Sequence, residues 1–127
     1  MTRKIIETDR APQAIGPYSQ AIVSNGFVFT SGQVPINPAS GNIEATTFGE
    51  QVHQSLKNVA ALLEAAGSDL HRIVKITVFL TDLSQFAVLN EVFQEYFPAN
   101  QAARSAVQVS RLPLDAMVEI EAVATLE

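Results

Sequence analysis

The sequence predicts one α+β domain over residues 1–127, in which two α-helices cover one face of a mixed β-sheet. Three observations lead to this fold class. A β-hairpin signal stands near the start of the chain, two later stretches have the periodicity of amphipathic helices, and runs of strand-forming residues follow each of these stretches. A length of 127 residues is typical of one domain and is enough to bury a core.

The hairpin signal is the pair Asn25-Gly26. Runs of mostly β-branched and aromatic residues lie on both sides of it, at residues 21–23 and 27–29. Asn-Gly is a preferred pair for the type I′ turn, because both of its central residues have positive φ. We therefore expect two antiparallel strands joined by this turn. Residues 35–42 are rich in proline, glycine and asparagine, and they predict a loop after the hairpin.

The first helix is expected to begin after Thr47. Thr47 and Glu50 have the spacing of a capping box, in which each side chain bonds the backbone of the other residue. Gly67 is a typical C-terminal stop. Between them, apolar residues recur at spacings of three and four, as on one face of a helix: Val52, Leu56, Val59, Leu63 and Ala66.

A run of β-branched and aromatic residues predicts a strand over residues 73–80. Simple alternation divides its side chains between two faces, with Val74, Ile76, Val78 and Leu80 on one and Ile73, Thr77 and Phe79 on the other. Both faces carry enough apolar side chains that we expect each of them to be buried against other structure.

A second helix is expected to begin near Ser84 and to end at Pro98. Two more strands, beginning near Arg104 and Met117, complete the chain. The side chains of this helix that we expect to point inward are Phe86, Leu89, Phe93 and Phe97.

The composition indicates an oligomer. Two helices cover one face of such a sheet, and the other face still carries apolar residues such as Ile73 and Phe79. Hydrophobic residues make up 47% of the chain and charged residues only 17%, which is little charge for the surface of a small monomer. We therefore expect subunits to pack against each other on the uncovered face.

Charge and residue usage exclude several classes of function. The net charge is −5 and the basic residues are scattered, which disfavours nucleic acid as a partner. The chain has no cysteine, so disulfides, thiolate nucleophiles and most structural zinc sites are ruled out. No segment resembles a signal peptide or a membrane span, and we therefore expect a cytoplasmic protein without a membrane partner.

Arg104 is the first candidate site residue. It stands among the small residues of Ala102-Ala103 and Ser105-Ala106, an arrangement that suits a clamp for a carboxylate. The strand that begins near Met117 carries Glu119 and Glu121 on one face. If the two strands pair, cation and carboxylate lie close together and form a site for a small acid with a base beside it. The pattern also fits a surface arginine and a solvated strand face, and it does not choose between the two glutamates.

Other candidates have ordinary explanations beside the functional ones. Tyr18 follows Gly16-Pro17, whose backbone constraints hold the ring in place, and Ser31-Gly32 ends a strand where backbone groups can meet a ligand. A packed tyrosine and a plain strand end explain the same residues. His53 and His71 have no neighbour at metal-ligand spacing, and His53 is expected to face solvent. We find no phosphate-binding glycine loop, dinucleotide motif or nucleophile elbow.

Four segments together resemble the RidA/YjgF family, and the similarity covers essentially the whole chain. Each segment alone is short, but their order and intervals are specific. They are Ile15-Gly16-Pro17-Tyr18-Ser19-Gln20, Thr30-Ser31-Gly32-Gln33-Val34-Pro35, Ala103-Arg104-Ser105-Ala106-Val107 and Val118-Glu119-Ile120-Glu121-Ala122.

The resemblance implies a chorismate-mutase-like subunit that assembles as a homotrimer, with ligand sites in the clefts between subunits. It also implies an activity, the hydrolysis of reactive enamines and imines such as 2-aminoacrylate and 2-iminobutanoate to 2-keto acids and ammonia. Members of this kind use neither a metal nor a cofactor. The small 2-imino or 2-keto acid is then the ligand.

Matching the motifs also implies residue roles. Arg104 binds the substrate carboxylate with help from the backbone amide of Ala106, and Glu119 positions the water. Glu121 is then left as a surface or structural charge. Further residues implied to line the pocket are Tyr18, Ser31 and Gly32 of the neighbouring subunit and, at its edge, Asn90.

The chain departs from the family pattern near Arg104. Ala102 stands where the family often has proline, and the stretch from Phe97 to Arg104 is shorter than in some relatives, which leaves the preferred substrate size open. Ala106 stands where the family often has cysteine, but this residue is implied to act through its backbone, so the loss of sulfur should matter little for catalysis. Two other functions are considered, a non-enzymatic carboxylate-binding or chaperone-like trimer and a ribonuclease or translation inhibitor. A carboxylate such as Glu119 beside an anionic ligand argues against a pure binder, and the net charge of −5 argues against the ribonuclease.

Overall fold

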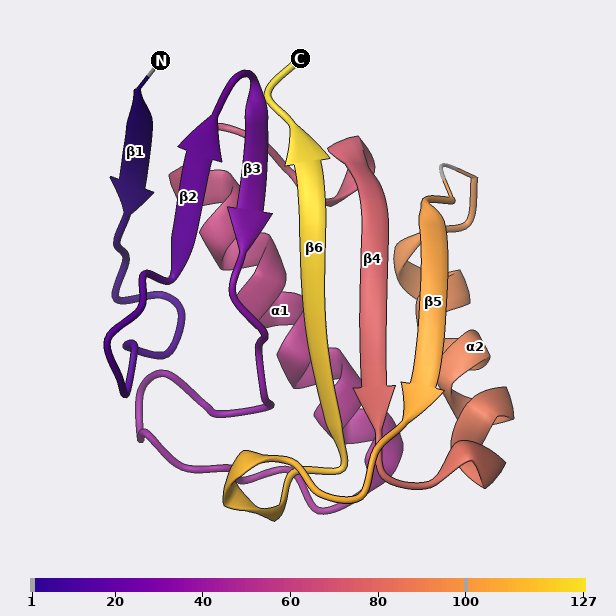
Figure 1. The fold of residues 1–127 in the computed structure, drawn as a ribbon. Helices are drawn as coiled ribbons and strands as arrows, with labels where there is room; N and C mark the ends of the chain where they lie inside the picture. The colour runs from indigo at the N-terminus through magenta and orange to yellow at the C-terminus, as the bar shows by residue number, and fades with distance from the viewer. Residues whose placement is uncertain (1, 100) are drawn as a thin grey trace.

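Residues 2–99 and 101–127 are described by a computed structural model, in which a six-stranded mixed sheet has two α-helices on one face (Figure 1). The expected α+β class is confirmed. In this part of the chain, no helix has the length and apolar character needed to cross a membrane. In chain order the elements are β1 Arg3–Ile6, β2 Ala21–Ser24, β3 Phe27–Thr30, α1 Phe48–Ala65, β4 Ile73–Leu80, α2 Phe86–Tyr96, β5 Ala103–Gln108 and β6 Val118–Thr125.

The strand order is β1-β2-β3-β6-β4-β5, so the last strand of the chain lies in the middle of the sheet. β1, β2, β3 and β6 form an antiparallel series, and β4 is antiparallel to β6. β5 is parallel to β4 and lies at the edge of the sheet, with α2 as the connection between the two strands (Figure 1). The two final strands, β5 and β6, are therefore not neighbours.

The predicted hairpin is confirmed. Asn25 and Gly26 have φ values of 54° and 82°, as the type I′ turn requires, and Ser24 pairs with Phe27. β1 is not among the elements that the sequence predicts. It is a short strand whose Ile6 pairs with Ala21 on the buried side of the sheet.

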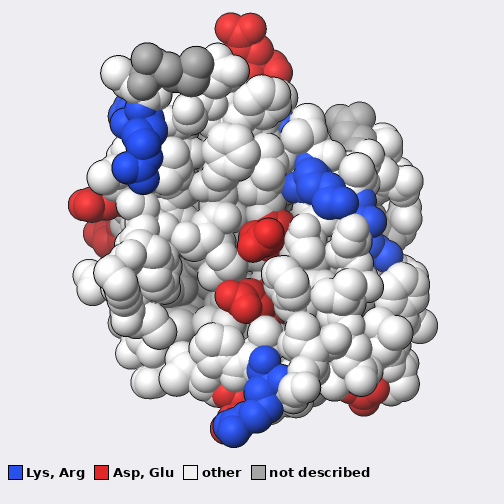
Figure 2. Space-filling view, viewed as in Figure 1, with Lys and Arg blue, Asp and Glu red and all other residues white. Residues whose placement is uncertain are grey.

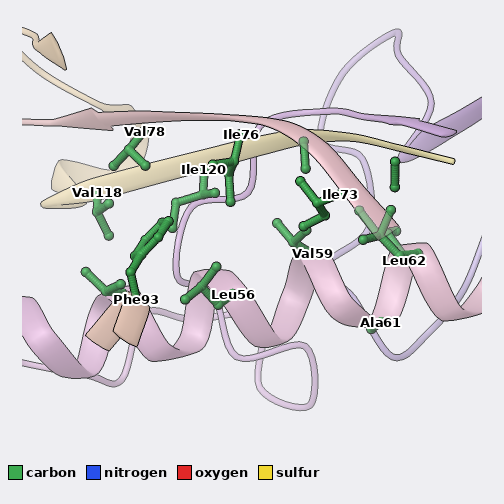
Figure 3. Close-up of a cluster of buried hydrophobic side chains, with 14 of the residues drawn as sticks. Leu56, Val59, Ala61, Leu62, Ile73, Ile76, Val78, Phe93, Val118 and Ile120 are labelled. Carbon is green, nitrogen blue, oxygen red and sulfur yellow. The ribbon is translucent and has the colours of Figure 1, made fainter. Parts of the chain in front are cut away.

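The ends of α1 follow the predicted signals. The Thr47 hydroxyl accepts a hydrogen bond from the backbone N–H of Glu50 at 3.3 Å, and the Glu50 carboxylate accepts one from the backbone N–H of Thr47 at 3.3 Å. Beyond the helix, Gly67 has a φ of +90°, which suits glycine at this position. The apolar stripe of α1 packs on the sheet and forms the core (Figure 3).

β4 corrects the expected division of its side chains. Its pairing with β6 shifts between Ile73 and Lys75, as in a β-bulge, so alternation restarts inside the strand. Ile73 therefore lies on the same side as Ile76, and both point toward α1 (Figure 3). Val74, expected inside, is 44% exposed. Ile73 is accordingly not part of the uncovered face.

The second helix begins later than expected. A 3₁₀ turn spans Leu83–Gln85, where the Asp82 carboxylate accepts a hydrogen bond from the backbone N–H of Ser84 at 2.9 Å, and α2 starts at Phe86. Leu89, Phe93 and Phe97 are buried as predicted. Phe86 is 39% exposed, because the helix starts beside the edge strand β5 rather than over the centre of the sheet.

The face of the sheet opposite the helices is open and partly apolar. Phe27 and Phe29 of β3 are exposed on it, and Glu119 and Glu121 of β6 share the same side. Figure 2 shows this face, with acidic side chains near its centre and basic side chains at scattered places around it. The expectation of an uncovered apolar face holds, although Phe29 rather than Ile73 carries it.

Candidate functional site

Arg104 lies on the helix-covered side of the sheet. Its partner in the β4–β5 register is Ile76, which is buried in the core, and neighbouring partners share a face. The guanidinium carbon Cζ lies 5.2 Å from the centre of the Phe86 ring and 5.1 Å from that of Phe93. Burial lowers the pKa of Arg104, although an arginine stays charged at neutral pH.

A cavity of about 270 Å³ opens beside this guanidinium. We call it the Arg104 cavity. Within residues 2–99 and 101–127 no acidic side chain lies within 4 Å of Arg104, so its charge has no counter-ion there. The residues that line the Arg104 cavity are Ile76, Asn90, Phe93, Gln94, Phe97, Gln101, Ala102 and Arg104. Asn90, which the resemblance implies at the edge of the pocket, is one of these lining residues, and its contact with a ligand stays a prediction.

Ala106 follows Arg104 on the same side of β5, where it pairs with Val78. β5 is an edge strand, and such strands present backbone groups that the sheet does not use. The role expected for the Ala106 amide stays a prediction.

Glu119 points to the opposite side of the sheet. It pairs with Phe79, whereas the adjacent pair, Val78 with Ile120, faces the core. The pKa of Glu119 is raised, first because partial burial removes water from the carboxylate and second because the negative charge of Glu121 lies nearby. A carboxyl with a raised pKa is a stronger base than an ordinary surface glutamate.

Gly32 leaves the space that the Glu119 carboxyl occupies. A Cβ atom on Gly32 would lie 2.8 Å from the Glu119 Cδ, closer than real Cβ contacts allow. Glycine is thus the residue that lets the β3 end approach this side chain. The strand end at Ser31-Gly32 therefore packs closely against Glu119, and its contact with a ligand stays a prediction.

Tyr18, Gly32 and Glu119 line a second cavity, together with Gln20, Gln33 and Pro113 among others. We call it the Glu119 cavity. Its volume is about 60 Å³, which is room for only a few water molecules. The Tyr18 hydroxyl accepts a hydrogen bond from the backbone N–H of Ile15 at 3.3 Å. Three of the expected site residues therefore meet within one chain.

Ser31 stands beside the Glu119 cavity rather than among its lining residues. Its hydroxyl donates a hydrogen bond of 2.6 Å to the carbonyl of Ser19, and its backbone N–H donates one of 2.9 Å to the carbonyl of Gln20. These bonds tie the segment that holds Tyr18 to the end of β3. A direct contact between Ser31 and a ligand stays a prediction.

The strands of Arg104 and Glu119 do not pair, so the condition under which these two side chains would lie close together in one chain is not met. β4 lies between β5 and β6, and the two side chains point to opposite faces of the sheet. The two cavities share no lining residue. Alternation along a strand assigns each side chain to one of the two faces of that strand. It does not tell which face of a second, distant strand lies on the same side of the sheet.

Three contacts were not predicted. The rings of Phe86 and Phe93 lie against Arg104, and their spacing around Asn90 on one helix face is the signal that could have indicated this. His53, expected to face solvent, is half-buried, with its Nδ1 atom 3.0 Å from the Tyr96 hydroxyl. Within the described residues, no group of three or more His, Cys, Asp or Glu side chains could hold a metal ion.

Known proteins match this sequence along nearly its whole length. The sequence matches the family described as Endoribonuclease L-PSP over residues 8–126. It is 48% identical to a RutC family protein of Pyrococcus abyssi, over 100% of both chains, and 44% identical to the human 2-iminobutanoate/2-iminopropanoate deaminase, over 98% of this chain and 90% of that one.

A solved structure has the same fold as this chain. The structure of Escherichia coli TdcF with bound serine superposes with a TM-score of 0.90, at 50% identity, and covers 96% of this chain and 98% of that one. The fold, the four motifs and the matched relatives lead to the same conclusion. This chain belongs to the RidA/YjgF family.

Proposed function

We propose that this protein hydrolyses small 2-imino acids and their enamine tautomers to 2-keto acids and ammonia, at sites completed between the subunits of a homotrimer. The observation that carries the proposal is a pair of complementary half-sites. One holds an arginine that has no counter-ion among the described residues, and the other holds a glutamate with a raised pKa beside Gly32. The name of the human relative, a 2-iminobutanoate/2-iminopropanoate deaminase, agrees with this chemistry.

Arg104 orients the substrate. Its guanidinium binds the carboxylate of the imino acid through paired hydrogen bonds, so the C2 atom next to that carboxylate is held in a fixed place. The positive charge also favours withdrawal of electrons from the C=N bond. Asn90 lines the same cavity and supplies an amide at its edge.

Glu119 handles the water and the protons. It holds a water against C2 of the protonated imine and accepts a proton as the water oxygen bonds to that carbon and the C=N π electrons move to nitrogen, which leaves a neutral amine and a hydroxyl group on C2. It then returns that proton to nitrogen, the C2–N bond breaks, and ammonia leaves as Glu119 takes the hydroxyl proton and the C2–O double bond forms; this proton passes to the solvent or to the departing ammonia. General acid-base catalysis of this kind contributes about 10²- to 10⁴-fold.

The reaction needs Arg104 and Glu119 at the same C2 atom, yet in one chain they face opposite sides of the sheet. A neighbouring subunit resolves the conflict, because head-to-tail packing in a ring brings the Arg104 cavity of one subunit to the Glu119 cavity of the next. Tyr18, Gly32 and Glu119 then come from one subunit and Arg104 and Asn90 from the other. The exposed Phe27 and Phe29 support burial of the open sheet face in this assembly.

Mixing two inactive variants tests the proposal. Arg104→Ala and Glu119→Gln are each expected to lose most activity toward 2-iminobutanoate, which a threonine dehydratase generates in the assay. After both are unfolded and refolded together in equal amounts, about one quarter of the clefts combine an intact Arg104 with an intact Glu119. Activity should therefore return to about a quarter of the wild-type level.

Each variant refolded alone is the control. Mixed trimers that contain both chains by native mass spectrometry, but that regain no activity, would contradict a site shared between subunits. Undiminished activity of Arg104→Ala by itself would overturn the proposed reaction. A protein that binds 2-ketobutyrate but never accelerates imine hydrolysis would instead be a carboxylate-binding module.

The family description names an endoribonuclease, and charge argues against that function for this chain. The net charge is −5, and acidic side chains lie near the centre of the open sheet face (Figure 2). A polyanion such as RNA is repelled from this surface. Cleavage of RNA by the purified Arg104→Ala variant, with a contaminating nuclease excluded, would reverse this argument.

A further inference from the structure

We propose that Phe86 and Phe93 are positioning residues for Arg104, which hold its guanidinium in place without neutralising it. This inference rests on the proposed role of Arg104 as the carboxylate clamp. With this inference the site gains two residues, Phe86 and Phe93, whose side chains have no polar group and act on the ligand through Arg104. The ligand class that follows is a small monoanionic carboxylate, which supplies the missing negative charge.

The two rings reach Arg104 from one helix. Phe86 and Phe93 are seven residues apart on α2, which is two turns, so their side chains share a face. Asn90 lies between them on that same face, and it lines the Arg104 cavity. The Cζ atom of Arg104 is 5.2 Å from one ring centre and 5.1 Å from the other. Both distances are within the range in which a cation is attracted to an aromatic ring.

A partly buried arginine needs a partner, and the kind of partner decides what else it can bind. A protein carboxylate would satisfy the charge and would compete with the substrate for the same N–H groups. Aromatic rings attract the cation through their electron-rich faces and accept no conventional hydrogen bonds. The five N–H donors of Arg104 then stay available for the carboxylate of a ligand.

Neighbouring packing makes one of the rings rigid. Phe93 is buried, and its centre lies 5.6 Å from that of Phe97, which is buried behind it. Phe86, the first residue of α2, is partly exposed, so a change at this position disturbs the core less. The pair thus offers one substitution at a rigid position and one at a position that tolerates change.

The test replaces each ring by an aliphatic side chain and then restores it. Phe86→Leu and Phe93→Leu remove the ring, whereas Phe93→Tyr and Phe86→Trp keep one. Phe48→Leu is the matched control, because Phe48 is a buried core residue that does not line the Arg104 cavity. The dissociation constant for 2-ketobutyrate is measured by calorimetry, and kcat and KM are measured with 2-iminobutanoate.

Each leucine variant is expected to weaken 2-ketobutyrate binding about five-fold and to raise KM by a similar factor with kcat nearly unchanged, because the ring acts on ligand binding and transition state alike. The tyrosine and tryptophan variants should bind like the wild type, and so should Phe48→Leu. Phe86→Leu keeps the test valid if Phe93→Leu fails to fold.

Two results would overturn the inference. One is unchanged binding in Phe86→Leu, and the other is a loss of binding that the aromatic replacements do not restore. The Arg104→Ala variant separates this failure from a failure of the proposed function. If Arg104→Ala also binds 2-ketobutyrate normally, the clamp itself is wrong, whereas if only the leucine variants bind normally, the clamp stands and the rings do not position it.

Discussion

The Arg104 cavity and the Glu119 cavity hold opposite charges, and different kinds of neighbouring residue surround the two charged groups. In the Arg104 cavity, α2 lays two aromatic rings against a cation, and the packing is that of a helix on a sheet. In the Glu119 cavity, a glycine at the end of β3 leaves space for a carboxyl group, whose pKa is raised first by partial burial and second by another carboxylate on the same strand. If, as proposed, the first cavity binds the substrate carboxylate and the second transfers protons, changes in the two should have separable effects.

The largest expected effect on ligand binding is in the Arg104 cavity. Arg104→Ala should weaken 2-ketobutyrate binding about 100-fold, since it removes a charge-assisted pair of hydrogen bonds to the carboxylate. Calorimetry with 2-ketobutyrate measures the loss, and Arg104→Lys should recover only part of it because lysine lacks the planar fork. Equal binding by the alanine and wild-type proteins would remove the distinction between the two cavities.

The Glu119 cavity should respond in the opposite way. Glu119→Gln keeps the size of the side chain but removes the base, so kcat should fall about 10²-fold or more while 2-ketobutyrate binding is largely retained. Stopped assays of keto acid release give kcat, and calorimetry gives the affinity. Loss of binding in parallel with loss of activity would point to a structural role for Glu119.

A change at Gly32 sharpens the comparison without touching a charged group. Gly32→Ala places a methyl group 2.8 Å from the Glu119 Cδ, so the carboxyl group must move and kcat should fall about ten-fold. Gly49→Ala is the matched control, because its Cβ meets no atom closer than the Val88 side chain at 3.4 Å and the Val92 side chain at 4.0 Å. A thermal melt of both variants separates displacement of Glu119 from loss of stability, and a wild-type kcat in Gly32→Ala would contradict this account.

The smallest expected effect is a shift in pH dependence. Repulsion from Glu121 raises the pKa of Glu119, in addition to the larger effect of burial, so Glu121→Gln should lower that pKa. In the proposed mechanism the deprotonated Glu119 is the active form, so the acid limb of the pH profile should move to lower pH, with the rate at pH 8 nearly unchanged. An acid limb that stays in place, or that moves to higher pH, would show that Glu121 does not act on Glu119.

Much of the fold could be predicted because its signals are local. Asn25-Gly26, the Thr47–Glu50 capping box and Gly67 each depend on the conformation of adjacent residues, and each is confirmed. The predicted division of the β4 side chains between two faces is wrong at Val74, because the signal there is not local. A bulge arises from pairing with β6, about 50 residues further along the chain, and no pattern inside β4 records it.

The sequence by itself determined the family, the α+β class and the identity of the candidate residues, because turn geometry, helix periodicity and short motifs depend on residues close together in the chain. Only the tertiary structure decided that β4 separates β5 from β6, that Arg104 and Glu119 face opposite sides, and that Phe86 and Phe93 meet the guanidinium. Strand order and facing depend on contacts between residues far apart in the chain, and their free energies are settled only when the whole sheet forms.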